Sequence, residues 1–176
     1  PLVKKTVCHF AEALRADDRI SLITYSGSTA KILSPTAGDQ KETIIAALKP
    51  LRAHGATAGG EALRMAYDAA AKNYRKDGIY QAAQRAYIRN GINRILLATD
   101  GDFNVGISDP AALKSYVAEK RKSGISLTTL GFGAGNYNDE MMEQLADAGD
   151  GNYSYIDNED EAKKVLVRQL GSTLAT

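Results

Sequence analysis

A short apolar segment in the middle of the chain constrains the fold more than any other feature. Residues 95–98 (ILLA) form a continuous hydrophobic run, which is typical of a strand buried on both faces of a parallel sheet. The run ends in Thr99-Asp100-Gly101-Asp102. In open α/β sheets, ligands bind beyond the carboxyl ends of the strands, so carboxylates at this place are candidates for metal or substrate contact. Asp and Gly are also the usual turn residues, and this segment alone favours neither interpretation over the other.

Strand and helix patterns alternate along the rest of the chain. Strands are expected over residues 19–25, 30–33, 94–99, 125–131 and 152–156, and helices over 1–16, 40–48, 63–70, 110–124, 139–148 and 159–174. The first two strands are joined by so few residues that they are expected to be antiparallel. A second helical pattern over 79–87 indicates a kinked or paired helix after residue 70, with an insertion around 76–87. The alternation predicts a mostly parallel sheet with helices on both faces.

Length and composition exclude several classes of protein. The 176 residues fit a single domain, 1–176, with a sizeable core. With 22 basic and 21 acidic residues, the chain offers no electrostatic case for binding nucleic acid or an anionic membrane. Cys8 is the only cysteine, which excludes an intrachain disulfide and thiolate zinc clusters. No segment is long and apolar enough to span a membrane, and composition leaves the compartment open.

Two motifs, in this order of strands and helices, indicate a family. The segment 55–60 (GATAGG) precedes a helix, and Thr99-Asp100-Gly101 close the apolar strand. In this combination the chain resembles the von Willebrand factor A domain family. It is most similar to a bacterial group of uncharacterised members, through ATDGDFNVG at 98–106 and GFGAGNYNDEMMEQLA at 131–146. The resemblance covers nearly the whole chain and implies a Rossmann-like α/β fold, with one antiparallel edge strand on the mostly parallel central sheet.

The resemblance also implies a divalent cation, usually Mg²⁺, in a metal-ion-dependent adhesion site at the top of the sheet. Its ligands in the family are an Asp-x-Ser-x-Ser segment, a Thr and an Asp, and Thr57 and Asp100 match the last two. Mg²⁺ prefers hard oxygen ligands in an octahedral shell that retains water. In this family a carboxylate of another protein completes that shell. We therefore expect a protein-binding module that engages an acidic residue of its partner, in an extracytoplasmic or cell-envelope location.

One departure from the family concerns the first strand. No Asp-x-Ser-x-Ser segment occurs in this sequence, and Ser26-Gly27-Ser28 lack the required Asp. In the family this segment immediately precedes the first helix, which opens this chain. We expect that the first strand and three metal ligands lie upstream of Pro1, and that this strand fits between 19–25 and 94–99. Without it, Mg²⁺ should bind weakly. Upstream residues, closure of the two strands or strand-swapped self-association would then fill the slot.

The main alternative is enzymatic. Asp100-Gly101-Asp102 has the D-x-D pattern of magnesium-dependent phosphoryl-transfer enzymes, in which Asp100 would be the nucleophile. Such phosphatases continue with Gly-Thr, where this chain has Phe103-Asn104, and their nucleophile strand comes early in the chain. We therefore expect a module that is not an enzyme. A purely structural domain that binds no metal is a third interpretation. Nearby His54 is expected to be solvated, and His9 to need no function on the polar side of the first helix.

Overall fold

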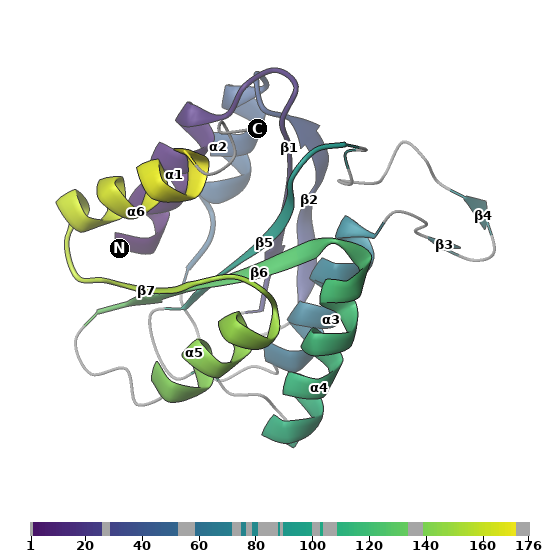
Figure 1. Cartoon of the computed structure of the whole chain (residues 1–176). Helices are drawn as coiled ribbons and strands as arrows, with labels where there is room; N and C mark the ends of the chain where they lie inside the picture. Colours follow the sequence, from purple (N-terminus) through teal and green to yellow (C-terminus); the bar gives the residue numbers. More distant parts are fainter. Residues whose placement is uncertain are drawn as a thin grey trace.

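The computed structural model describes residues 2–25, 29–52, 59–71, 75–76, 79–80, 88, 90–99, 103, 109–133 and 139–171. Helices and strands alternate over most of this length, as the sequence patterns predict (Figure 1). The helices are α1 (Leu2–Ala13), α2 (Lys41–Leu48), α3 (Gly59–Ala70), α4 (Pro110–Lys120), the short 3-10 helix η2 (Arg121–Ser123), α5 (Asp139–Ala148) and α6 (Glu159–Gly171). The strands are β1 (Arg19–Thr24), β2 (Ala30–Ala37), β3 (Arg75–Lys76), β4 (Ile79–Tyr80), β5 (Asn93–Thr99), β6 (Ile125–Phe132) and β7 (Tyr153–Ile156).

The central strands are parallel. β5 pairs with β6, and β6 pairs with β7, so that Leu97 lies beside Thr129 and Thr129 beside Tyr153. β1 pairs antiparallel with β2 over Arg19↔Ala37 to Thr24↔Ala30. The expected antiparallel neighbour is therefore present and extends past residue 33. These pairings confirm an α/β architecture with an antiparallel strand at one side.

Helices cover both faces of the sheet (Figure 1). On one face, α3, α4 and α5 contribute the largest core cluster, whose fully buried members include Leu63, Leu113, Met142 and Leu145. On the other face, α1 and α6 pack over the ends of β6 and β7, where Leu2, Val3, Leu130, Phe132, Ile156 and Val165 meet. A third cluster joins α1 and α2 to β1 and β2. Along β5, buried residues alternate with half-buried ones, so one face of this strand is covered more completely than the other.

No backbone ladder joins β1 to β5, although both strands lie wholly within the described residues. The β1–β2 pair and the β5–β6–β7 sheet are separate hydrogen-bonded units, and α3 packs against both β1 and β5. Five of the six residues of β1 are half-buried, whereas seven of the eight residues of β6, which has a partner on each side, are buried. Closure of the two strands onto each other, one of the three expected outcomes, therefore does not occur.

The insertion after α3 differs from the expected helix. β3 and β4 form an antiparallel hairpin in which Lys76 pairs with Ile79, so the helix predicted from residue 79 is wrong at Ile79 and Tyr80. The two residues between the paired positions are Asp77 and Gly78, and Asp-Gly is among the strongest signals for a two-residue hairpin. That local signal outweighs the helical period of the apolar residues. The expected helix over 81–87 lies outside the described residues.

The start and end of α4 match the signals in the sequence. The carboxylate of Asp109 accepts a hydrogen bond of 3.1 Å from the backbone N–H of Ala111, and Pro110 opens the helix. Gly124 follows η2 with a φ of +84°, a left-handed conformation that glycine adopts without strain. Asp109 therefore sets the start of α4, and Gly124 ends the helical segment after η2.

Candidate functional site

Tyr25, which follows β1, and Gly59, which begins α3, both lie against the ring of Phe103. Phe103 is only 2% exposed, although the residues before it in sequence are Asp-Gly-Asp. Its ring lies edge-on to the ring of Tyr25, with centroids 6.1 Å apart and an interplanar angle of 84°. The ring also lies against the backbone of Gly59, where an added Cβ would come within 2.2 Å of Phe103 Cε2. Phe103 therefore brings the two sequence motifs together.

The predicted metal ligands Thr57 and Asp100 lie outside the described residues, as do His54, Asp102 and residues 26–28. Their neighbours in the chain are described. Gly59 comes two residues after Thr57, and Thr99, which is 6% exposed at the end of β5, directly precedes Asp100. An extended chain spans at most about 3.6 Å per residue, so Thr57 lies within roughly 7 Å of Gly59. That Thr57 and Asp100 meet at the edge of the sheet remains a prediction.

Tyr25 also ties β1 to β5. Its phenol donates a hydrogen bond of 2.8 Å to the backbone carbonyl of Ala98, the penultimate residue of β5. Tyr25 directly follows β1, and Ala98 directly precedes Thr99, so the bond joins the carboxyl ends of two strands that share no ladder. The hydrogen bond therefore links the two strand ends two residues before Asp100 in the sequence.

Carboxylates gather where the helices begin. α5 and α6 start on the side where β6 and β7 end (Figure 1). The acidic residues at the starts of α3 to α6 are Glu61 in α3, Asp109 before α4, Asp139 and Glu140 in α5, and Glu159, Asp160 and Glu161 in α6. A helix N-terminus carries about half a positive charge, against a full negative charge for each carboxylate. A carboxylate is therefore favourable at each of these helix starts, and Glu159 is in addition paired with Lys5 and His9.

One of these carboxylates is engaged by a phenol. Asp139 Oδ1 accepts a hydrogen bond of 2.6 Å from the hydroxyl of Tyr153 in β7. Burial of the hydroxyl and then its bond to Asp139 raise the pKa of Tyr153 above its ordinary value. Tyr153 therefore stays protonated and continues to donate to Asp139. This hydrogen bond links the start of α5 to strand β7.

The described residues alone do not provide a metal centre. Within them, no group of three His, Cys, Asp or Glu side chains is placed to hold an ion. The donor types at the two motifs, a threonine hydroxyl and an aspartate carboxylate, are hard oxygens that fit Mg²⁺. An ion at this edge would therefore depend on oxygens of the segments 53–58 and 100–102.

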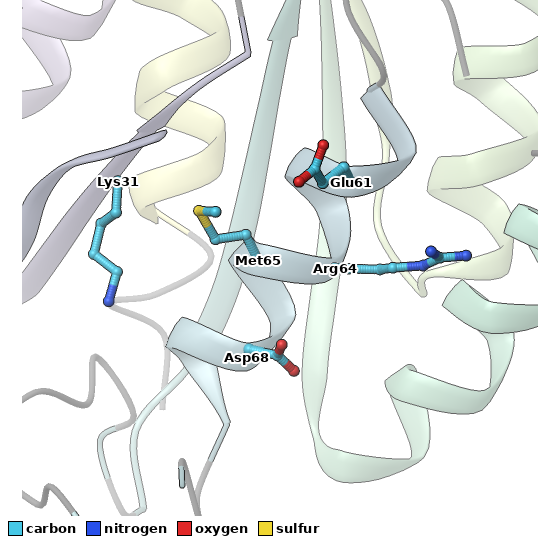
Figure 2. A pocket seen from close by; sticks show the side chains of 5 residues that line it. All are labelled: Lys31, Glu61, Arg64, Met65 and Asp68. Atoms are coloured by element: carbon cyan, nitrogen blue, oxygen red, sulfur yellow. The ribbon is translucent and has the colours of Figure 1, made fainter. Parts of the chain in front are cut away.

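A separate hollow lies between β2 and α3, lined by Lys31, Glu61, Arg64, Met65 and Asp68 (Figure 2). Arg64 points away from Lys31 in this view, and its Cζ lies 5.8 Å from the centre of the Tyr116 ring in α4. The lining combines two cations with two carboxylates, so it concentrates neither sign of charge. The hollow gives no electrostatic case for a charged ligand of either kind.

Sequence reasoning missed the packing function of Phe103, Gly59 and Tyr25. Phe103 entered that reasoning only as a departure from a phosphatase motif. One signal was available: a phenylalanine inside the otherwise polar run Asp-Gly-Asp-Phe-Asn is expected to be buried. The sequence did not show which residues pack against the Phe103 ring, because Gly59 and Tyr25 lie far from Phe103 in the chain.

Comparison with known proteins agrees with this architecture. The family model of the von Willebrand factor type A domain matches residues 1–169. An uncharacterised protein of Escherichia coli (strain K12), YfbK, is 44% identical over 176 residues, which cover all of this chain and 28% of that protein. The chain thus spans less than half the length of the curated relatives it matches.

Solved structures share the fold at low sequence identity. A von Willebrand factor type A protein from Catenulispora acidiphila matches with a TM-score of 0.71 and 16% identity, over 98% of this chain and 38% of that one. Proximal thread matrix protein 1 from the mussel byssus, in a structure with a zinc-occupied MIDAS motif, matches with a TM-score of 0.61 and 18% identity, over 99% of this chain and 40% of that one. No helix within the described residues is long and apolar enough to cross a membrane.

Proposed function

The chain belongs to the von Willebrand factor type A domain family, and from this membership we propose that it is a protein-binding module with a divalent cation at the carboxyl end of its sheet. Thr57 and Asp100 would bind the cation, and an acidic side chain of a partner protein would complete its shell. The observation that supports this proposal is the contact between Gly59 and Phe103, because it joins the elements that flank the two ligand loops. The zinc-occupied motif of the mussel protein supports a divalent ion in this fold.

The two proposed ligands differ in charge. Asp100 offers a carboxylate and Thr57 a neutral hydroxyl, so together they leave a divalent ion with unbalanced positive charge. When bound, the cation supplies a Lewis-acidic position that a carboxylate from outside can occupy. Phe103 is buried against Gly59, the first residue of the helix that follows the segment of Thr57.

A first experiment tests the ligands. In the full-length protein, Mg²⁺ titrated calorimetrically is expected to bind the wild type and to bind Thr57→Ala and Asp100→Ala much more weakly. Asp157→Asn is the matched control, because it removes an exposed carboxylate that directly follows β7, at the same edge. Equal affinity in all four proteins would rule out Thr57 and Asp100 as ligands.

A second experiment separates the module from an enzyme. Hydrolysis of p-nitrophenyl phosphate with Mg²⁺ is expected to be absent, because Asp100-Gly101-Asp102 is followed by Phe103-Asn104 and not by the Gly-Thr of such phosphatases. Turnover that disappears in Asp100→Asn would instead identify phosphoryl transfer through Asp100 and Asp102. Metal-dependent retention of an aspartate-containing peptide, but not of its asparagine analogue, would support the module.

A further inference from the structure

We propose that the open edge of β7 binds an extended, lysine- or arginine-rich segment of another protein, which joins the sheet as an additional strand. In strand addition, backbone hydrogen bonds supply the affinity, and the alternating side chains of the added strand supply the specificity. β7 is the last strand of the β5–β6–β7 sheet, and within the described residues no strand pairs with its outer side. Binding at this edge uses no metal ligand, so it is independent of the proposed cation site.

The backbone polar groups of Tyr153 and Tyr155 point toward this open edge. The carbonyls of Asn152 and Ile156 accept hydrogen bonds of 3.0 and 3.4 Å from the backbone of β6 and of the residue that follows it. Successive residues of a strand direct their N–H and C=O groups to opposite sides of the strand. The N–H and C=O groups of the two tyrosines therefore point away from β6, where an added strand would pair with them.

The charge around the edge determines which kind of strand fits it. Residues 123–162, which include β6, α5 and β7, contain nine acidic residues and no Lys, Arg or His. Asp150 comes three residues before β7 and Asp157 directly follows it, and both are exposed. Neither forms an ion pair within the part of the chain that the structure describes. This edge therefore attracts a cationic segment and repels nucleic acid and anionic lipid.

Stabilisation of helix ends does not explain two of these carboxylates. Anions are favourable at the N-terminus of a helix, and cations at its C-terminus. Asp147 lies in the last turn of α5 and Glu143 in the middle of that helix, and both are exposed. After burial and the hydrogen bond to Asp139, the charge of Glu143 also raises the pKa of Tyr153, so Glu143 lies beside β7. The negative charge thus extends along the whole side of α5 next to the edge strand.

The two tyrosine rings give the added strand a surface on the face that α5 covers. Tyr153 packs against the core cluster of that face, and Tyr155, two residues later in the strand, projects to the same side. Tyr155 is 37% exposed. A Lys or Arg cation is attracted to the face of an aromatic ring within about 6 Å. Cationic side chains at every second position of the added strand would lie over the Tyr155 ring and face the carboxylate of Glu143.

A second copy of this chain does not fit the same edge. Pairing of β7 with β7 would bring Asp150 and Asp157 of two copies close together, and like charges on paired strands are destabilising. Charged residues beside a short edge strand commonly prevent such self-pairing. The outer strand at the other side of the domain, β2, contains Pro35, which has no backbone N–H to donate. The edge of β7 and a basic partner are therefore the favoured combination.

A synthetic peptide tests strand addition without any variant of the protein. The probe is fluorescently labelled Thr-Lys-Val-Lys-Val-Lys-Thr with blocked ends, titrated against the full-length protein in EDTA and followed by fluorescence anisotropy. Binding is expected, and it should weaken as the salt concentration rises from about 50 to about 300 mM. The same peptide with Glu in place of each Lys should not bind. Absence of binding by the lysine peptide at low salt would overturn the proposal.

Two N-methylated peptides separate strand addition from simple charge attraction. One carries N-methyl groups on its three Lys residues, and the other carries them on the two Val residues between them, so every charge is kept. Only one of these sets of amides points toward β7 in a paired strand. Strand addition predicts that one peptide binds at least about tenfold more weakly than the unmodified probe, whereas the other retains its affinity. Equal affinities of the two methylated peptides would contradict strand addition.

Hydrogen exchange and one pair of variants locate the bound peptide. Exchange of the backbone amides of Tyr153 and Tyr155 is expected to slow when the lysine peptide binds, and exchange in β2 to stay unchanged. Glu143→Gln should weaken binding by about twofold to fivefold. Glu42→Gln is the matched control, because it removes an exposed carboxylate from α2, beside the β1–β2 pair, and it should leave the affinity unchanged. Protection at another edge, or equal effects of both variants, would rule out β7 as the site.

Discussion

The phenol of Tyr25 donates a hydrogen bond of 2.8 Å to the carbonyl of Ala98, across the boundary between two sheets that share no backbone ladder. Tyr25 and Ala98 are far apart in the sequence and come together because α3 packs against both β1 and β5. The bond therefore belongs to the tertiary arrangement that unites the two halves of the domain.

Removal of this phenol tests how much the bond stabilises the fold. Tyr25→Phe is expected to lower the free energy of unfolding by about 1 kcal/mol, the usual net contribution of one hydrogen bond. Urea denaturation monitored by circular dichroism would measure it. Tyr155→Phe serves as the control, since Tyr155 is 37% exposed and its bond to the Gly133 carbonyl competes with water. A loss in Tyr25→Phe no larger than in Tyr155→Phe would argue against the bridging function.

The gap between β1 and β5 leads to a prediction about an additional strand. Each buried backbone group without a partner costs about 1–3 kcal/mol, against a net stability of about 5–15 kcal/mol for a whole domain. We predict that a longer version of the protein, in which an upstream segment supplies a strand to this gap, is more stable and binds Mg²⁺ more tightly than residues 1–176 alone. Titration and urea denaturation of both would decide this. Equal, tight binding by both would show that the upstream segment does not hold the ion.

Tyr67 supplies a prediction of increased stability. Its side chain is 1% exposed, and its hydroxyl has no hydrogen-bond partner within the described part of the chain. An unsatisfied buried polar group costs about 1–3 kcal/mol, so Tyr67→Phe is expected to raise the free energy of unfolding by about 1 kcal/mol. Tyr116→Phe, which removes a half-exposed hydroxyl from the adjoining ring, should bring no such gain. Destabilisation by Tyr67→Phe would show that the hydroxyl has a partner after all.

Tyr67 also predicts sensitivity to alkaline pH. Burial, followed by the nearby Tyr116, raises the pKa of Tyr67 above its ordinary value. The unfolded chain ionises this tyrosine near pH 10, whereas the folded protein keeps it protonated. The ionisation of Tyr67 therefore leaves the free energy of unfolding unchanged below about pH 10 and lowers it as the pH rises further. Unfolding measured at pH 8 and pH 11 should show a smaller decrease in Tyr67→Phe than in the wild type.

His9 has a contact that its place on the polar side of α1 did not predict. Its Nε2 lies 3.0 Å from Glu159 Oε1, and Lys5 Nζ lies 3.5 Å from Glu159 Oε2, so both residues join α1 to the start of α6. The hydrogen bond with His9 and then the charge of Lys5 lower the pKa of Glu159. This contribution to stability is present above the ordinary glutamate pKa and is lost as the pH falls through the lowered one.

Acid unfolding of Glu159→Gln tests this contact. The variant is expected to be less stable than the wild type at pH 7, and the difference should disappear as the pH falls through the lowered pKa of Glu159, since both proteins then lack the charge. The effect should be small, because the pair is exposed and screened by solvent. Asp160→Asn, in the same first turn of α6, is the matched control and should change little. A difference that persists at low pH would indicate a packing effect.

Local patterns in the sequence determined the order of elements and the family. The apolar run 95–98, the Asp109-Pro110 helix start and the alternation of strands with helices each depend on neighbours within a few residues, so they are readable without the fold. The two motifs around Thr57 and Asp100 were recognisable for the same reason. The Asp77-Gly78 hairpin signal was equally local, but the sequence interpretation gave it less weight than the helical period of the apolar residues that follow it, and the structure shows the hairpin.

Only the tertiary structure decided how the two motifs are joined. The insertion of Phe103 between Tyr25 and Gly59, and the gap between β1 and β5, depend on how α3 lies across two separate sheets. Only the structure explains why position 59 is a glycine, because the Phe103 ring occupies the space that a side chain would fill. Contacts between residues far apart in the chain result from close packing of the whole core, and periodicity along the sequence carries no information about which distant side chain fills a given space.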